Sequence, residues 1–86
     1  MNVNIKRYVK ERDEMLKKCS VEELTKFMEK HKHLYAEGFY EDFVKASYFV
    51  KEATLYKMIV NVPKLPKALR AKSYMWLCSH GMSAEL

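Results

Sequence analysis

The stretch from Phe39 to Asn61 constrains this chain most, because apolar residues recur along it at nearly every position around a helix. At about 100° per residue, they fall on three lines of one long helix. The lines hold Phe39, Phe43, Ala46, Val50 and Ala53; Tyr40, Val44, Tyr48, Leu55, Met58 and Ile59; and Phe49, Tyr56 and Val60. Glu41, Lys45 and Glu52 form a narrow charged strip. We therefore predict one continuous helix that other elements cover on most of its circumference.

Three further helices are predicted from periodicity and from local start and stop signals. Ser20 and Glu23 form a capping box, in which each side chain can bond the other residue's backbone N–H. Gly38 and Gly81 suit the left-handed conformation that follows a helix, and Pro63 ends the long helix. No segment alternates apolar and polar residues as a strand would. The sequence predicts an all-α fold, a compact four-helix domain with helices at about 3–18, 21–35, 39–61 and 66–79, with the third helix central and a short tail at 82–86.

The size of the chain favours a single domain over residues 1–86. A chain of this length buries only about 60% of its unfolded surface, so its core is thin and a partner or a dimer is expected. No apolar run approaches the length of a membrane span and no leader is evident, which predicts a cytoplasmic protein without membrane contact. Cys19 and Cys78 each fall on the apolar arc of a helix, and we predict reduced, buried thiols.

Metal and catalytic sites are not favoured by the spacing of the chemically active residues. His31 and His33, like Cys78 and His80, are two positions apart, which places their side chains on opposite sides of a helix. The alternative of a metal site assembled across the core from His31, Cys19 and Cys78 stays open at this stage. We predict no metal, no cofactor, no catalytic residues, no small-molecule substrate and no enzymatic activity, with His31 at the edge of the core.

The positive charge lies in the last third of the chain. The net charge is +5, and residues 53–84 contain five Lys or Arg and no acidic residue. On the fourth helix, Lys67, Arg70 and Tyr74 share one side, with Lys64 nearby. We predict an anion-binding edge there that could contact nucleic-acid phosphates, against the alternative of an ordinary solvated face.

The surplus of apolar surface suggests a second kind of contact. Phe49, Tyr56 and Val60 form a line that a monomer could leave uncovered, and Arg12 is a charged residue within the apolar arc of the first helix. The alternative for Arg12 is that it packs or stacks on a tyrosine. The sequence predicts a non-enzymatic protein-interaction module, an accessory, adaptor or inhibitor protein, whose partner is another protein or a second copy. A nucleic-acid-associated regulator is the alternative.

Overall fold

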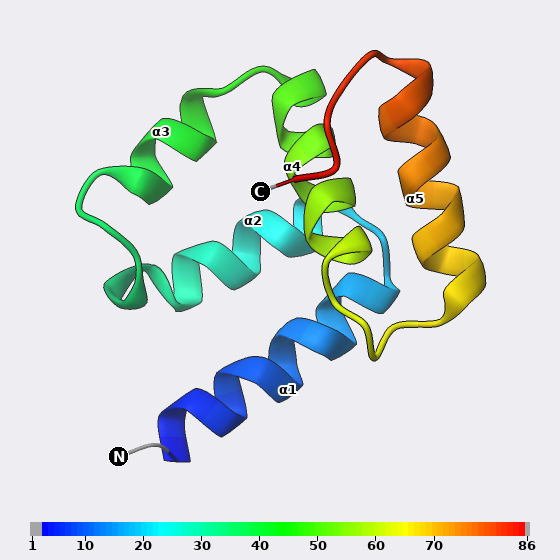
Figure 1. The fold of residues 1–86 in the computed structure, drawn as a ribbon. Coiled ribbons are helices and arrows are strands. Elements are labelled where there is room, and N and C mark those ends of the chain that lie inside the picture. Colours follow the sequence, from blue (N-terminus) through cyan, green and yellow to red (C-terminus); the bar gives the residue numbers. More distant parts are fainter. Residues whose placement is uncertain (1–2, 86) are drawn as a thin grey trace.

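The computed structural model describes residues 3–85, with side chains from residue 5 onward, and this part of the chain is helical with no strand. The five α-helices are α1 (Val3–Lys17), α2 (Val21–Lys30), α3 (Phe39–Lys45), α4 (Tyr48–Val60) and α5 (Lys67–Ser79), and a short 3₁₀ turn, η1 (Lys32–Leu34), follows α2. The all-α prediction is confirmed, and the number of helices is five rather than four. In Figure 1, α4 lies between α3 and α5.

The prediction of one continuous helix over residues 39–61 is wrong. The chain leaves helical geometry at Ala46 and Ser47, whose backbones are extended with ψ of 157° and 158°. The Ser47 hydroxyl then accepts the backbone N–H of Val50 at 3.3 Å and caps the start of α4. The long helix is therefore two helices joined by an elbow, and α4 alone occupies the central position.

The second helix is also shorter than predicted. It ends at Lys30, and within the rest of the predicted range 21–35 only Lys32–Leu34 is helical, as η1. At its start, the backbone N–H of Glu23 donates to the Ser20 hydroxyl at 3.3 Å, as expected. The Glu23 carboxylate does not return that bond and lies 3.6 Å from the Lys18 ammonium instead. Gly38 has the expected left-handed backbone, with φ of 86°, but there it precedes α3.

The end of the last helix is confirmed in detail. Gly81 is left-handed, its N–H donates to the Cys78 carbonyl, and the N–H of Met82 reaches back to the Leu77 carbonyl at 2.9 Å. These two bonds make a Schellman motif, which satisfies carbonyls at the helix end. The tail then turns back along α4 (Figure 1), where the Asn61 amide donates to the Ala84 carbonyl at 2.8 Å. Leu86, the last residue of the predicted tail, lies outside the described residues.

The core forms where α4 packs against α5, α2 and α1. Its buried apolar residues are Met15, Leu16, Val21, Leu24, Phe27, Met28, Phe43, Ala53, Leu55, Ile59, Val62, Leu65 and Leu77. The predicted burial of both thiols is wrong. Cys78 is exposed on α5, and Cys19 is partly exposed between α1 and α2, where its φ of 52° takes it out of the helix.

Candidate functional site

The elbow between α3 and α4 carries a set of uncovered apolar side chains. Five large side chains within twelve consecutive positions are 41–57% exposed: Phe39, Val44, Tyr48, Phe49 and Val50. We call these five residues the elbow surface. The sequence analysis placed four of them on a rod covered by its neighbours and missed their exposure. The sequence did contain one signal of the break. Ser47 is a residue type that often caps the start of a helix, and it lies within the apolar stretch.

The elbow surface is exposed because α3 has few neighbours. Its principal packing partner is α2, and Phe43 is its one buried residue among those described. Phe39 contacts Tyr35 with a ring-centre distance of 5.4 Å, yet remains 45% exposed. The first turn of α4 is likewise apolar and uncovered at three successive positions. The exposed apolar side chains of the elbow therefore come from two helices.

An aromatic cluster joins this surface to α5. The rings of Trp76 and His80 stack with centres 4.0 Å apart, and Phe49 lies 5.6 Å from each of them. Tyr56 lies 4.9 Å from Trp76 on the inner side of the cluster. Burial raises the pKa of the Tyr56 hydroxyl, as expected for a side chain covered by neighbouring helices. Phe49 and His80 are thus the exposed members of this aromatic cluster, and Trp76 and Tyr56 are partly covered.

The four residues predicted to bind a partner do not form one surface. Phe49 belongs to the elbow surface, whereas Tyr56 and Val60 are partly covered along the α4–α5 seam. Arg12 lies on α1, 27% exposed, and its guanidinium donates twice to the Asp13 carboxylate at 3.0–3.1 Å. A paired and partly buried guanidinium supports neither stacking on a tyrosine nor an open contact.

The predicted basic edge is partly assembled. Lys67, Arg70 and Tyr74 line a shallow groove of about 270 Å³ together with Val60 and Ala71. Arg70 Nε donates to the Leu65 carbonyl at 3.2 Å, which leaves the other nitrogens of the guanidinium for a ligand. The neighbouring Cys78 thiol raises the pKa of Tyr74. Lys64 is not part of this groove, and instead faces α1 across a different one.

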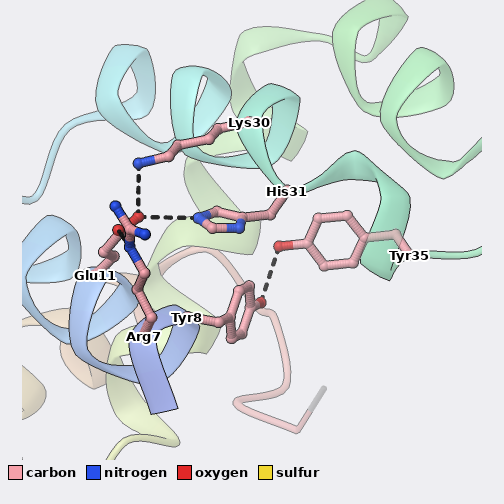
Figure 2. A network of polar contacts seen from close by, with 6 residues as sticks. All are labelled: Arg7, Tyr8, Glu11, Lys30, His31 and Tyr35. Atoms are coloured by element: carbon pink, nitrogen blue, oxygen red, sulfur yellow. Dashed lines mark hydrogen bonds and ion pairs between the residues drawn. The ribbon is translucent and has the colours of Figure 1, made fainter. Parts of the chain in front are cut away.

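A polar network joins α1 to the end of α2 (Figure 2). Glu11 Oε1 lies 3.0 Å from Lys30 Nζ and 3.1 Å from His31 Nε2, while Arg7 Nε donates to Oε2 at 3.1 Å. The hydrogen bonds from Lys30 and His31 lower the pKa of Glu11 to about 2. The carboxylate is therefore ionised near neutral pH and bonded to three neighbouring side chains, which suits a structural link better than proton transfer.

Aromatic contacts extend this network inward. The hydroxyls of Tyr8 and Tyr35 lie 2.9 Å apart, and the Tyr8 ring meets the His31 ring edge-on at 5.1 Å. Burial and the Tyr8 hydroxyl raise the pKa of Tyr35. His31 is buried with one ring nitrogen bonded to Glu11, which confirms its predicted place at the edge of the core.

No metal-binding group is present in the described chain. Among residues 3–85, no three side chains of the types His, Cys, Asp or Glu come together closely enough to hold an ion. The suggested combination of His31, Cys19 and Cys78 is therefore not assembled. Over the same residues, no helix has the length and apolar character needed to cross a bilayer.

Comparisons of this chain with protein-family models, with curated proteins and with solved structures found no match. Its function must be inferred from its own surfaces.

Proposed function

We propose that this protein is a non-enzymatic protein-interaction module, an accessory, adaptor or inhibitor protein, whose partner docks on the elbow surface. The observation that carries the proposal is the exposure of five large apolar side chains over residues 39–50. Large apolar side chains exposed together in one segment of a small protein favour a contact surface, whereas single exposed apolar residues are ordinary.

The composition of the elbow surface supports this assignment. It contains Phe39, Tyr48 and Phe49, and aromatic residues are enriched in the buried centres of protein interfaces. Charged residues share α3 with Phe39 and Val44, with Glu41 and Asp42 in its first turn and Lys45 in its last. An apolar centre with a polar rim is the usual anatomy of an interface between proteins. The partner is another protein or a second copy of this chain.

Site-directed photocrosslinking in the cell that makes the protein tests the proposal. A photoreactive phenylalanine analogue in place of Tyr48 should form one or a few discrete adducts, because this side chain is the most exposed of the five. The matched control carries the same analogue at Lys72, an exposed position on α5 away from the elbow. Equal labelling at both positions, or none at Tyr48, would contradict a docking role for the elbow surface.

A second candidate function is supported by the basic groove on α5. Lys67 and Arg70 lie beside the exposed ring of Tyr74, and residues 53–84 contain no acidic side chain. Cations beside an aromatic ring could hold the phosphates and one base of a single strand. We propose nucleic-acid binding as the alternative, in a regulator that uses this edge.

Fluorescence anisotropy with mixed oligonucleotides tests this alternative. Binding should weaken steeply with added salt and should fall when Lys67 and Arg70 are replaced by Glu. The control reverses Lys72 and Lys57, which changes the net charge equally but leaves the groove intact. An absence of binding at low salt would eliminate this function. An equal loss of affinity in the control variant would show that binding is only non-specific charge attraction.

A further inference from the structure

The first turn of α1 lies at one edge of the molecule (Figure 1). Ile5 and Leu16 are about three helical turns apart and lie on nearly the same line of this helix. Leu16 is fully buried, whereas Ile5 is 51% exposed. The apolar stripe that fixes α1 to the core therefore continues past the core, and its outer end is uncovered.

A groove of about 470 Å³ runs beside this outer end, between α1 and the turn that joins α4 to α5. Ile5, Val9 and Leu65 form its apolar floor. Leu65 is anchored by burial in the core, so this wall of the groove is fixed by packing. The apolar part of the groove is aliphatic and spans about one turn of α1.

The rim of the groove is basic. Lys6, Lys10 and Lys64 line it and make no ion pair with another described residue. Two acids also line it, but both are neutralised by neighbours within α1. The pairs are Asp13 with Arg12 at 3.0 Å and Glu14 with Lys17 at 3.6 Å. The groove therefore presents an apolar floor beneath three unpaired positive charges.

This combination selects one kind of occupant. A helix with apolar residues at spacings of three and four would cover the floor, and carboxylates flanking that stripe would meet the lysines. A nucleic acid fits less well, because no aromatic side chain lines the groove for a base to stack on. We infer that the groove between α1 and residues 62–65 docks an acidic amphipathic helix of a partner protein.

This surface is distinct from the elbow surface, so either proposal can fail without the other. It also assigns a role to Lys64, which the structure separates from Lys67 and Arg70.

Two labelled synthetic helical peptides test the inference with the whole chain. Both carry the same leucine stripe over about four turns, and one has Glu and the other Lys at the flanking positions. The Glu peptide should bind at least about tenfold more tightly than the Lys peptide, and its affinity should fall with added salt. Equal affinity for the two peptides, or no binding of the Glu peptide at low salt, would overturn the inference.

Variants then locate the contact. Replacing Lys6 and Lys64 by Glu should weaken binding of the Glu peptide by about tenfold. Replacing Lys26 and Lys72 by Glu is the matched control, because these exposed lysines lie outside the groove and give the same change in net charge. An Ile5→Asn variant should also lose affinity while its circular dichroism stays unchanged, since Ile5 is half exposed. Equal losses in the test and control pairs would show non-specific attraction and refute the assignment.

A membrane surface is the remaining occupant with similar chemistry. Vesicles containing phosphatidylserine should not displace the Glu peptide if the groove is built for a helix. Displacement by vesicles, with loss of vesicle binding in the Lys6 and Lys64 variant, would assign the groove to lipid and overturn the inference.

Discussion

At the scale of single residues, Glu11 is the polar contact with the most partners. Its carboxylate forms ion pairs with Arg7 on its own helix and with Lys30 at the end of α2, and it bonds the His31 ring (Figure 2). Two of these three bonds cross between helices, so the group holds α1 and α2 together at their polar edge. Charge-assisted bonds of this kind are stronger than neutral ones, and they depend on the carboxylate staying ionised.

The stability of the protein should therefore fall in acid partly through Glu11. Its pKa is about 2 in the folded protein and near 4.5 when unperturbed, so the unfolded chain takes up the proton first. The contribution is present above about pH 4.5 and is lost as the pH falls towards 2. Urea unfolding across this range should show a smaller decline of the free energy of unfolding for Glu11→Gln than for the wild type.

Glu41→Gln is the matched control for this measurement, because Glu41 is exposed and forms no ion pair with another described residue. Its acid dependence should follow that of the wild type. If Glu11→Gln and Glu41→Gln give the same pH profile, the Glu11 network does not stabilise the protein in solution.

At the scale of elements, one side chain caps the second helix of the elbow. The Ser47 hydroxyl satisfies the N–H of Val50, which has no partner within the helix because it lies in the first turn of α4. Ser47→Ala should lower the free energy of unfolding by about 1 kcal/mol. Thermal and urea denaturation measure this loss.

Thr54→Ala provides the contrast within the same helix. The Thr54 hydroxyl donates to the Val50 carbonyl, which is already an acceptor within the helix, and alanine has the higher helix propensity. This variant should keep or slightly raise stability. A Ser47→Ala protein that is as stable as the wild type would mean that the cap does not maintain the elbow.

The seam between α4 and α5 is built on small side chains. Ala53 and Ser73 are buried on the two helices, and the Ser73 hydroxyl donates to the Leu69 carbonyl of its own helix. Small residues at a contact allow two helix axes to approach closely. Ser73→Leu should cost about 1–3 kcal/mol, because the larger side chain must separate the helices.

A leucine introduced at an exposed position of α5 isolates this effect. Ala68→Leu should change stability by less than about 0.5 kcal/mol, since Ala68 faces solvent. Similar values for Ser73→Leu and Ala68→Leu in urea denaturation would contradict close packing at the seam.

The comparison between sequence and structure shows which elements were predictable. Local signals were read correctly where the determining residues are neighbours, as at Ser20 before α2 and at Gly81 after α5. The elbow was not predicted, because α3 and α4 bury different faces. Phe43 is buried on α3, whereas Leu55 and Ile59 are buried on α4. When residues 39–61 are treated as one helix, both buried faces fall on it, and the helix looks apolar on nearly every side.

At the scale of the whole molecule, the surfaces were predictable only in part. The spacing of Lys67, Arg70 and Tyr74 along one helix was enough to place them together. Lys64 was misplaced because the direction of the connecting turn is set by tertiary packing, through burial of Val62 and Leu65. The elbow surface and the groove on α1 are exposed because no other helix of the described chain packs over them. Such exposure is set by tertiary packing, so no local sequence pattern predicts it.

Unequal packing should also produce unequal local stability. The helix α4 packs on α5, α2 and α1, whereas α3 is seven residues long and packs mainly on α2. Segments with few buried contacts open with a lower free energy than the core does. We expect amide hydrogens of residues 39–45 to exchange well before those of residues 53–60.

Hydrogen exchange followed by mass spectrometry measures this order, because peptides on either side of Ser47 report α3 and α4 separately. In Ser47→Ala, exchange of residues 53–60 should speed up only as much as the loss of global stability requires. Phe43→Ala removes the buried side chain of α3 and should speed exchange most over residues 39–45. Equal protection of α3 and α4 would show that the elbow opens only with global unfolding. The elbow surface would then be presented to a partner as a fixed shape, rather than through a helix that detaches and docks separately.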